Sequence, residues 1–254
     1  MRQVNQVKSK QRVSDHGEVF TAEREVNAML DLVKHEAERI DSRCLEPSCG
    51  TGNFLVAILK RKLSVVQAEY RANQTDFERN AVLAVSSLYG VDILYDNVQE
   101  CRHNLFSVFD DLYSTLYGKK SKKDCRASIL FILDRNIVWG NTLTQHTPDA
   151  QPIVFSEWSF DKYNLVRRRD YAFAELVQAT KNTSPPLPLK EFPLTHFLQL
   201  HNCEDKLQSR RTDLLGEPEQ RRGVHAPPLG EPNVGHAARG TLAQQRREVS
   251  RSGL

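Results

Sequence analysis

The sequence predicts an α/β fold with a mostly parallel sheet, and three observations support this prediction. A short strand pattern, a glycine-containing turn and a helical pattern follow one another between residues 43 and 59. Two further strand-like runs, at 89–93 and 136–141, each include a polar side chain near their end. Helical patterns separate the three runs, and strands joined by helices build parallel sheets covered on both faces.

The first expected element is an amphipathic helix from Glu23 to Ile40, with Thr21 as its cap. Its apolar residues recur at helical spacing; they are Val26, Met29, Leu30, Val33, Ala37 and Ile40. We therefore expect residues 1–41 to form a helical N-terminal segment.

The next unit is a short buried strand at Arg43–Glu46, which ends at Pro47 and a glycine turn. A new helical pattern then begins; its apolar residues are Phe54, Leu55, Ile58 and Leu59. Strand, glycine turn and helix together predict a Rossmann-like ligand site.

The glycine turn itself predicts a site for an anion. Gly50 and Gly52 carry no side chains that would keep a ligand away, and a helix that begins near Asn53 directs free N–H groups toward that space. The dinucleotide fingerprint has a third glycine where this chain has Leu55. The turn therefore favours an anion smaller than a pyrophosphate, such as the carboxylate of a methionine moiety.

A second strand is expected at Tyr89–Ile93, after a helix over Asp76–Leu88. Asp92, at its end, is placed to accept hydrogen bonds from both hydroxyls of a ribose. The chain from Glu46 to Asp92 is longer than the roughly 20 residues of a simple dinucleotide unit. Glu69 therefore remains the alternative ribose acceptor.

The other expected elements follow in order: a helix from Asp96 to about Tyr113, a solvated loop at Lys119–Lys123, a third strand at Asn136–Asn141 and a fourth at Pro152–Phe155. Arg167–Arg169 lies near Tyr163 and Tyr171. We interpret this basic cluster either as a surface that binds a nucleic acid strand or as the solvated start of a helix.

Composition argues against disulfide-rich, zinc-binding, secreted and membrane-spanning proteins. The 254 residues carry a net charge of +3, which leaves the partner open, and their five cysteines show no CxxC pair or zinc spacing. We expect free thiols, no metal, and no secretion signal or membrane span. The expectation is a soluble cytoplasmic protein.

The segment from 204 to 254 differs from the rest of the chain. It contains no Phe, Trp or Tyr and holds six of the twelve glycines. Such a segment buries too little apolar surface to offset its ordering entropy, so we expect a disordered tail. The organisation predicted is a segment at 1–41, a domain at 42–203 and a tail at 204–254.

The motifs resemble those of N6-adenine DNA methyltransferases of the restriction-modification type, over about residues 15 to 200. The turn at 46–54 is similar to the family's cofactor loop, Gly90–Ile93 to its ribose-binding strand end, and Gly140–Leu143 to a third motif. The resemblance implies a class I methyltransferase fold, the cofactor S-adenosylmethionine and DNA as partner, with the segment 1–41 packing on the cofactor site. It implies these cofactor-binding residues: Phe20, Thr21, Glu46, Pro47, Ser48, Gly50, Gly52, Asn53, Phe54, Asp92, Ile93 and Asn141.

Three positions depart from the family pattern. Ala22 replaces a proline, and Asn141 replaces an aspartate that receives the adenine amino group. The catalytic tetrapeptide, Asn or Asp followed by Pro-Pro and Tyr or Phe, is absent; Ser184–Leu187 comes nearest but lacks the aromatic residue that stacks on the flipped base. No catalytic residue is therefore assigned.

The missing tetrapeptide leaves three functions open. The chain is either a DNA adenine methyltransferase that needs a second polypeptide for catalysis or target recognition, a catalytically inactive remnant or regulatory subunit, or a methyltransferase that acts on RNA or protein.

Overall fold

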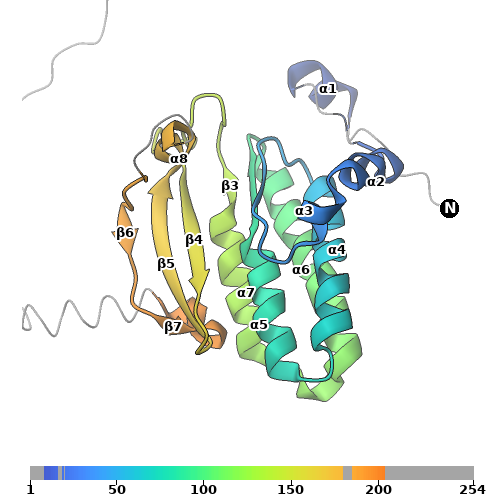
Figure 1. The fold of residues 1–254 in the computed structure, drawn as a ribbon. Helices are drawn as coiled ribbons and strands as arrows, with labels where there is room; N and C mark the ends of the chain where they lie inside the picture. Colours follow the sequence, from blue (N-terminus) through green and yellow to red (C-terminus); the bar gives the residue numbers. More distant parts are fainter. Residues whose placement is uncertain (1–8, 17–18, 20, 180–184, 204–254) are drawn as a thin grey trace, which may run out of the picture. The chain divides into compact units, whose positions relative to one another are not determined.

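The computed structural model describes residues 9–16, 19, 21–179 and 185–203 (Figure 1). Phe20, Ser184 and the predicted tail at 204–254 lie outside the described residues. Within the described ranges, no helix is both long and apolar enough to cross a membrane. The same ranges hold no group of three His, Cys, Asp or Glu side chains that could bind a metal ion.

A three-stranded parallel sheet carries the predicted strand ends. It comprises β1 (Cys44–Glu46), β2 (Leu88–Asp92) and β3 (Ile137–Trp139) in the order β1-β2-β3. Glu46 pairs with Gly90, and Asp92 pairs with Trp139. The prediction of an α/β protein with parallel strands is therefore confirmed.

Helices make the two crossovers between these strands. The first crossover consists of α4 (Asn53–Tyr70) and α5 (Gln74–Ser86), and the second of α6 (Tyr95–Tyr117), η1 (Gly118–Lys120) and α7 (Lys123–Asn136). Asn73 caps α5, because its side chain accepts from the N–H groups of Thr75 and Asp76. The two-helix first crossover explains the long spacing between Glu46 and Asp92.

The central strand β2 is buried along its whole length, and its two faces belong to different clusters. Leu88 packs with the apolar faces of α4, α5, α6 and α7 in the main core. Tyr89 and Val91 point the other way and pack with Ile153, Phe155 and Phe173. The alternation follows from the period of two along a strand.

A separate antiparallel sheet follows β3. The fourth strand predicted at 152–155 is confirmed in part, because a strand begins at Val154, but it belongs to this second sheet and not to the parallel one. The second sheet contains β4 (Val154–Phe160), β5 (Leu165–Ala172), β6 (Lys190–Glu191) and β7 (Thr195–His196). Figure 1 shows β4 and β5 side by side as a hairpin. Only a short turn joins them, whereas parallel neighbours need a crossover of a dozen or more residues.

The hairpin turn is fixed by Asp161 and Asn164. The Asp161 carboxylate accepts from the N–H groups of Tyr163 (2.8 Å) and Leu165 (2.9 Å). Asn164 has a positive φ of 62°, which an asparagine tolerates better than most residues. These two residues were the available sequence signal for the hairpin.

The N-terminal helices are shorter than predicted. They are α1 (Lys10–His16), α2 (Glu23–Leu32) and α3 (Lys34–Glu38), and Val33 leaves helical geometry between the last two. Thr21 does not cap α2: Ala22 holds the cap position without a side-chain hydrogen bond. The predicted apolar face is also partly wrong, because Met29 and Val33 are exposed while Val26, Leu30 and Ala37 are buried.

Three buried polar groups join elements distant in sequence. The ammonium of Lys62, which is fully buried in α4, donates to the carbonyls of Ile40 and Ser42 and to the hydroxyl of Ser87. Burial lowers the pKa of Lys62 to about 8, because it disfavours the charged form. This side chain ties the approach to β1 to the end of α5.

Glu78 of α5 is the second such group and is also fully buried. Its carboxylate accepts from the Tyr113 hydroxyl (2.5 Å), the Gln74 amide (2.7 Å) and the Lys122 ammonium (2.7 Å). The pKa of Tyr113 is raised, first by burial and then by this hydrogen bond. Lys122, which was predicted to lie in a solvated loop, therefore has a structural partner.

Arg168 of β5 is the third. It donates to Asp170 (2.7 Å) and Ser156 (3.0 Å), and its guanidinium lies 4.1 Å from the centre of the Phe192 ring.

Two short helices complete the described elements: α8 (Phe173–Ala179) follows β5, and η2 (Phe197–Asn202) follows β7. Leu200 of η2 donates its N–H to Ser128 of α7, which closes this side of the fold.

Candidate functional site

The turn after β1 is tight and rests on the neighbouring strand. The N–H of Cys49 donates to the Val91 carbonyl (2.9 Å), and the N–H of Gly52 returns to the Cys49 carbonyl (2.8 Å). Gly50 and Gly52 have positive φ angles of 52° and 92°. Residues with a Cβ rarely adopt these angles, so the turn requires both glycines.

Helix α4 begins immediately after the turn, as predicted. Its first hydrogen bond within the helix runs from the N–H of Val56 to the Gly52 carbonyl (2.8 Å). The N–H groups of the three preceding residues, Asn53 to Leu55, therefore have no acceptor within the helix. They provide the electropositive helix end expected for an anion.

The surroundings of Gly52 correct one part of the sequence argument. A Cβ on Gly52 would lie 2.7 Å from the Sγ of Cys101 on α6. Gly52 therefore allows close packing of the turn on α6 and does not open space for a ligand. Cys49 and Cys101 are both buried, and the pKa of the Cys49 thiol is raised by its hydrogen bond with Cys101 and by burial. These properties fit a small packing residue.

Asp92 lies at the end of β2, and its carboxylate is hydrogen-bonded to the backbone of the turn. One carboxylate oxygen accepts from the N–H of Gly50 (2.8 Å), and the other from the N–H of Leu94 (2.9 Å) and the amide of Asn97 (3.3 Å). Only 5% of Asp92 is exposed. Each carboxylate oxygen can accept more than one hydrogen bond, so a ribose hydroxyl remains compatible with this arrangement.

Glu69, the alternative ribose acceptor, occupies a different place. It lies in the last turn of α4, about 24 Å along the helix axis from Asn53 at a rise of about 1.5 Å per residue. It is not at a strand end, and its side chain is exposed. Asp92 is thus the acid adjacent to the turn.

The loop after β3 reaches across to the first turn. The Thr142 hydroxyl donates to the Pro47 carbonyl (2.6 Å). The side-chain oxygen of Asn141, predicted to receive an adenine amino group, accepts from the N–H groups of Leu143 (2.9 Å) and Thr144 (3.3 Å). Asn141 therefore shapes its own loop, and the three strand ends form one connected edge.

The remaining predicted residues lie around this edge. Pro47 and Ser48 are exposed, while Glu46, Asn53 and Phe54 are half-buried. Burial raises the pKa of the Glu46 carboxyl, and a hydrogen bond with the Ser48 backbone opposes this shift.

The N-terminal segment reaches the edge at two points. The Asn53 amide donates to the Thr21 carbonyl (3.1 Å), so Thr21 contributes its backbone and not a cap. The guanidinium of Arg12 in α1 donates to Asp96 (2.6 Å) and Asn97 (3.1 Å) at the start of α6.

Two exposed aromatic residues at the same edge were missed by the sequence argument. Trp139 ends β3 and Tyr95 begins α6, and their ring centres lie 5.1 Å apart. The Trp139 N–H donates to the carbonyl of Ile93 (3.0 Å). Ile93, Tyr95 and Trp139 are 49%, 54% and 38% exposed. A search for exposed aromatics next to predicted strand ends would have found them.

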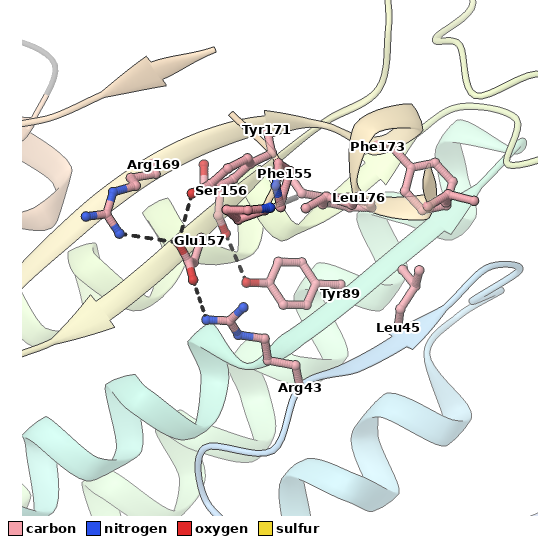
Figure 2. Close-up of a pocket in the computed structure, with 13 residues that line it drawn as sticks. Arg43, Leu45, Tyr89, Phe155, Ser156, Glu157, Arg169, Tyr171, Phe173 and Leu176 are labelled. Carbon is pink, nitrogen blue, oxygen red and sulfur yellow. Dashed lines mark hydrogen bonds and ion pairs between the residues drawn. The ribbon is translucent and has the colours of Figure 1, made fainter. Parts of the chain in front are cut away.

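A cavity of about 660 Å³ lies elsewhere, beside the middle of β1 and β2. Figure 2 shows Leu45 and Tyr89 below Phe155 and Phe173, and both pairs line this cavity. Pro185 and Pro186, from the sequence nearest to the catalytic tetrapeptide, also line it. No residue of the 46–54 turn is among its lining residues, so the geometry gives Pro185 and Pro186 no role beside the turn.

Ion pairs close one end of this cavity. Glu157 pairs with Arg43 (2.6 Å) and with Arg169 (3.7 Å), as the dashed lines in Figure 2 show. Arg167 and Arg169 both pair with Glu191, and Arg168 is buried. Residues 167–169 thus belong to a strand, so the interpretation of this basic cluster as the solvated start of a helix is wrong. Its interpretation as a surface that binds a nucleic acid strand stays a prediction.

Comparison with known proteins identified no relative of the chain. A scan against protein-family models, a search of curated proteins and a search of solved structures each found no match for the chain. The functional argument therefore depends on the geometry of the strand ends and on the sequence motifs there.

Proposed function

We propose that this chain binds S-adenosylmethionine at the carboxyl ends of β1, β2 and β3, and that it is the cofactor-binding polypeptide of a DNA adenine N6-methyltransferase. The observation that carries the proposal is the turn at Gly50–Gly52, which Asp92 fixes at the start of α4. Ligands of open α/β sheets bind at the carboxyl ends of the strands. An enzyme of this type modifies DNA in the cytoplasm, so we propose that location.

The residues at this edge fit the parts of the proposed cofactor. The N–H groups at the start of α4 favour the carboxylate of the methionine moiety. Asp92 provides one remaining acceptor position for a ribose hydroxyl, and Ile93 provides exposed apolar surface beside it. The bound cofactor supplies an electrophilic methyl group on a sulfonium.

Methyl transfer to adenine also requires acceptors for the protons of the exocyclic amine. In the family that the sequence resembles, the tetrapeptide supplies them, and this chain has none. Among the described residues, the parallel sheet has only the strands β1, β2 and β3, because the chain after β3 enters the antiparallel sheet. The described parallel sheet therefore has no fourth strand end that could carry a catalytic loop. We therefore propose that a second polypeptide supplies the catalytic loop and target recognition.

Calorimetric titration with S-adenosylmethionine tests the cofactor part of this proposal. Wild-type protein should bind, and Asp92→Asn should bind about 10- to 100-fold more weakly, because hydrogen bonds to a charged acceptor are lost. Glu69→Gln, at the far end of α4, is the matched control and should retain wild-type affinity. Thermal melts without ligand establish that each variant is folded.

The absence of heat and of a thermal shift with wild-type protein would overturn the proposal. Wild-type affinity in Asp92→Asn would remove Asp92 from the site, and weaker binding in Glu69→Gln would reassign the ribose contact.

The absent tetrapeptide favours a second candidate, a catalytically inactive subunit that binds cofactor and DNA. Transfer of a radiolabelled methyl group into DNA, RNA and protein in one cell extract separates the candidates. Label in DNA that depends on this chain supports the adenine methyltransferase, label in RNA or protein supports another substrate class, and binding without label supports the inactive subunit.

A further inference from the structure

The exposed aromatic pair at the sheet edge is not used by the proposed contacts. Trp139 lies at the last position of β3, in register with Asp92 of β2, and Tyr95 is the first residue of α6. Large aromatic side chains usually lose most of their solvent exposure on folding, because they bury much apolar surface. Here both remain at least one-third exposed at the edge where a ligand is proposed.

A hydrogen bond and a ring contact fix the orientation of the Trp139 indole. Its N–H donates to the Ile93 carbonyl at 3.0 Å, which holds the ring across the ends of β2 and β3. Tyr95 packs against it at an interplanar angle of 59°, so the two rings meet as a corner and do not cover each other as parallel rings would. Both residues therefore keep exposed area near Ile93.

We propose that Trp139 and Tyr95 form the wall on which the purine base of a nucleoside ligand stacks. The inference rests on the proposed function and deepens it, because it assigns the contact with the base to two residues outside the predicted cofactor-binding set. A ribose held at Asp92 has its base within reach of the paired position on the next strand. Neutral aromatic faces suit a purine, since stacking needs a π-face and no charge.

Tryptophan fluorescence provides a direct test, because the chain has only two tryptophans. Trp158 is buried and donates to Asn136, so Trp139 is the tryptophan exposed to ligand. S-Adenosylmethionine and adenosine should each change the emission of wild-type protein, whereas methionine should not. The change should disappear in Trp139→Phe, which keeps a ring but removes the indole.

Affinity measurements separate the base from the rest of the ligand. Tyr95→Ala and Trp139→Ala should each weaken the binding of S-adenosylmethionine about 5- to 100-fold, the range for losing one stacking partner. Tyr95→Ala leaves the bond from Trp139 to Ile93 in place, so it tests the wall even where Trp139→Ala unfolds. The control is Tyr163→Ala, a more exposed tyrosine in the β4–β5 turn, which should bind normally.

Failure of the inference and failure of the proposed function give different results. Calorimetric binding with unchanged emission and with wild-type affinity in Tyr95→Ala would overturn the wall and leave cofactor binding intact. An absence of binding to wild-type protein would overturn both. Emission changes with an adenine-containing single-stranded oligonucleotide, but none with S-adenosylmethionine or adenosine, would assign the pair to nucleic acid and also overturn the inference.

Discussion

Replacement of Gly52 by alanine tests the packing of the turn on α6, independently of any ligand. Gly52 has φ +92° and ψ +21°, and a methyl group there meets the Cys101 Sγ at 2.7 Å. The backbone angles should cost about 1–2 kcal/mol and the overlap about 1–3 kcal/mol. Alanine also lowers the entropy of the unfolded chain, which offsets about 0.4–1 kcal/mol, so the net loss of stability should be about 1–4.5 kcal/mol.

Two comparisons divide this loss into its parts. Gly118 also has a positive φ, of 50°, with a different ψ of −120°, and no atom would lie within 4 Å of a Cβ added there. Gly118→Ala should therefore show only the backbone cost. Cys101→Ala removes the sulfur and leaves Cα and Cβ of residue 101 at an ordinary 3.4 Å from the new methyl. The double variant Gly52→Ala, Cys101→Ala should recover about 1–3 kcal/mol relative to the sum of the single variants.

Equilibrium unfolding in urea, followed by circular dichroism, measures the free energies of unfolding of wild type and all four variants under one set of conditions. The reasoning is refuted if Gly52→Ala costs less than about 1 kcal/mol. It is also refuted if the coupling with Cys101 lies within about 0.5 kcal/mol of zero, the usual scatter for independent sites.

Two further predictions concern the buried polar groups. Lys62 has a folded pKa of about 8 and an unfolded pKa near 10.4, so the unfolded state binds more protons between these values and stability rises with pH across that window. The stability difference between wild type and Lys62→Met should change by about 3 kcal/mol from pH 8 to 10.5; parallel urea-unfolding profiles for the two proteins would contradict this. Glu78→Ala should cost about 3–5 kcal/mol, because it strands the buried Tyr113 hydroxyl and a lysine partner, whereas Tyr113→Phe should cost about 1–2 kcal/mol. Equal losses in the two variants, measured by thermal melts, would show that the carboxylate does not organise this cluster.

The parallel half of the fold was accessible from sequence because its signals are local. The strand, glycine turn and helix at 44–70 each have short-range patterns, and the structure follows them closely. The hairpin of β4 and β5 was missed because the arginines at 167–169 suggested exposure. Their charges are matched by Asp170, Glu157 and Glu191, and these partners come from tertiary pairing that a linear pattern does not reveal.

The candidate site shows the same division. The glycine turn before α4 and the position of Asp92 at the end of a neighbouring strand followed from the motif. The contact of Gly52 with Cys101 did not, because it depends on how closely α6 approaches the turn. The side-chain oxygen of Asn141 accepts from the backbone of its own loop. The residue type alone does not predict whether an asparagine oxygen binds a nearby backbone N–H or a ligand.

The position of β1 at the rim of the parallel sheet has a consequence for assembly. Among the described strands, β1 has a hydrogen-bonded neighbour on one side only, and it leads directly into the turn. A strand from another polypeptide that paired along the other side would stiffen the backbone just ahead of Gly50. Occupancy of the turn and formation of the complex would then reinforce each other, and thermodynamic reciprocity requires each to strengthen the other by the same factor.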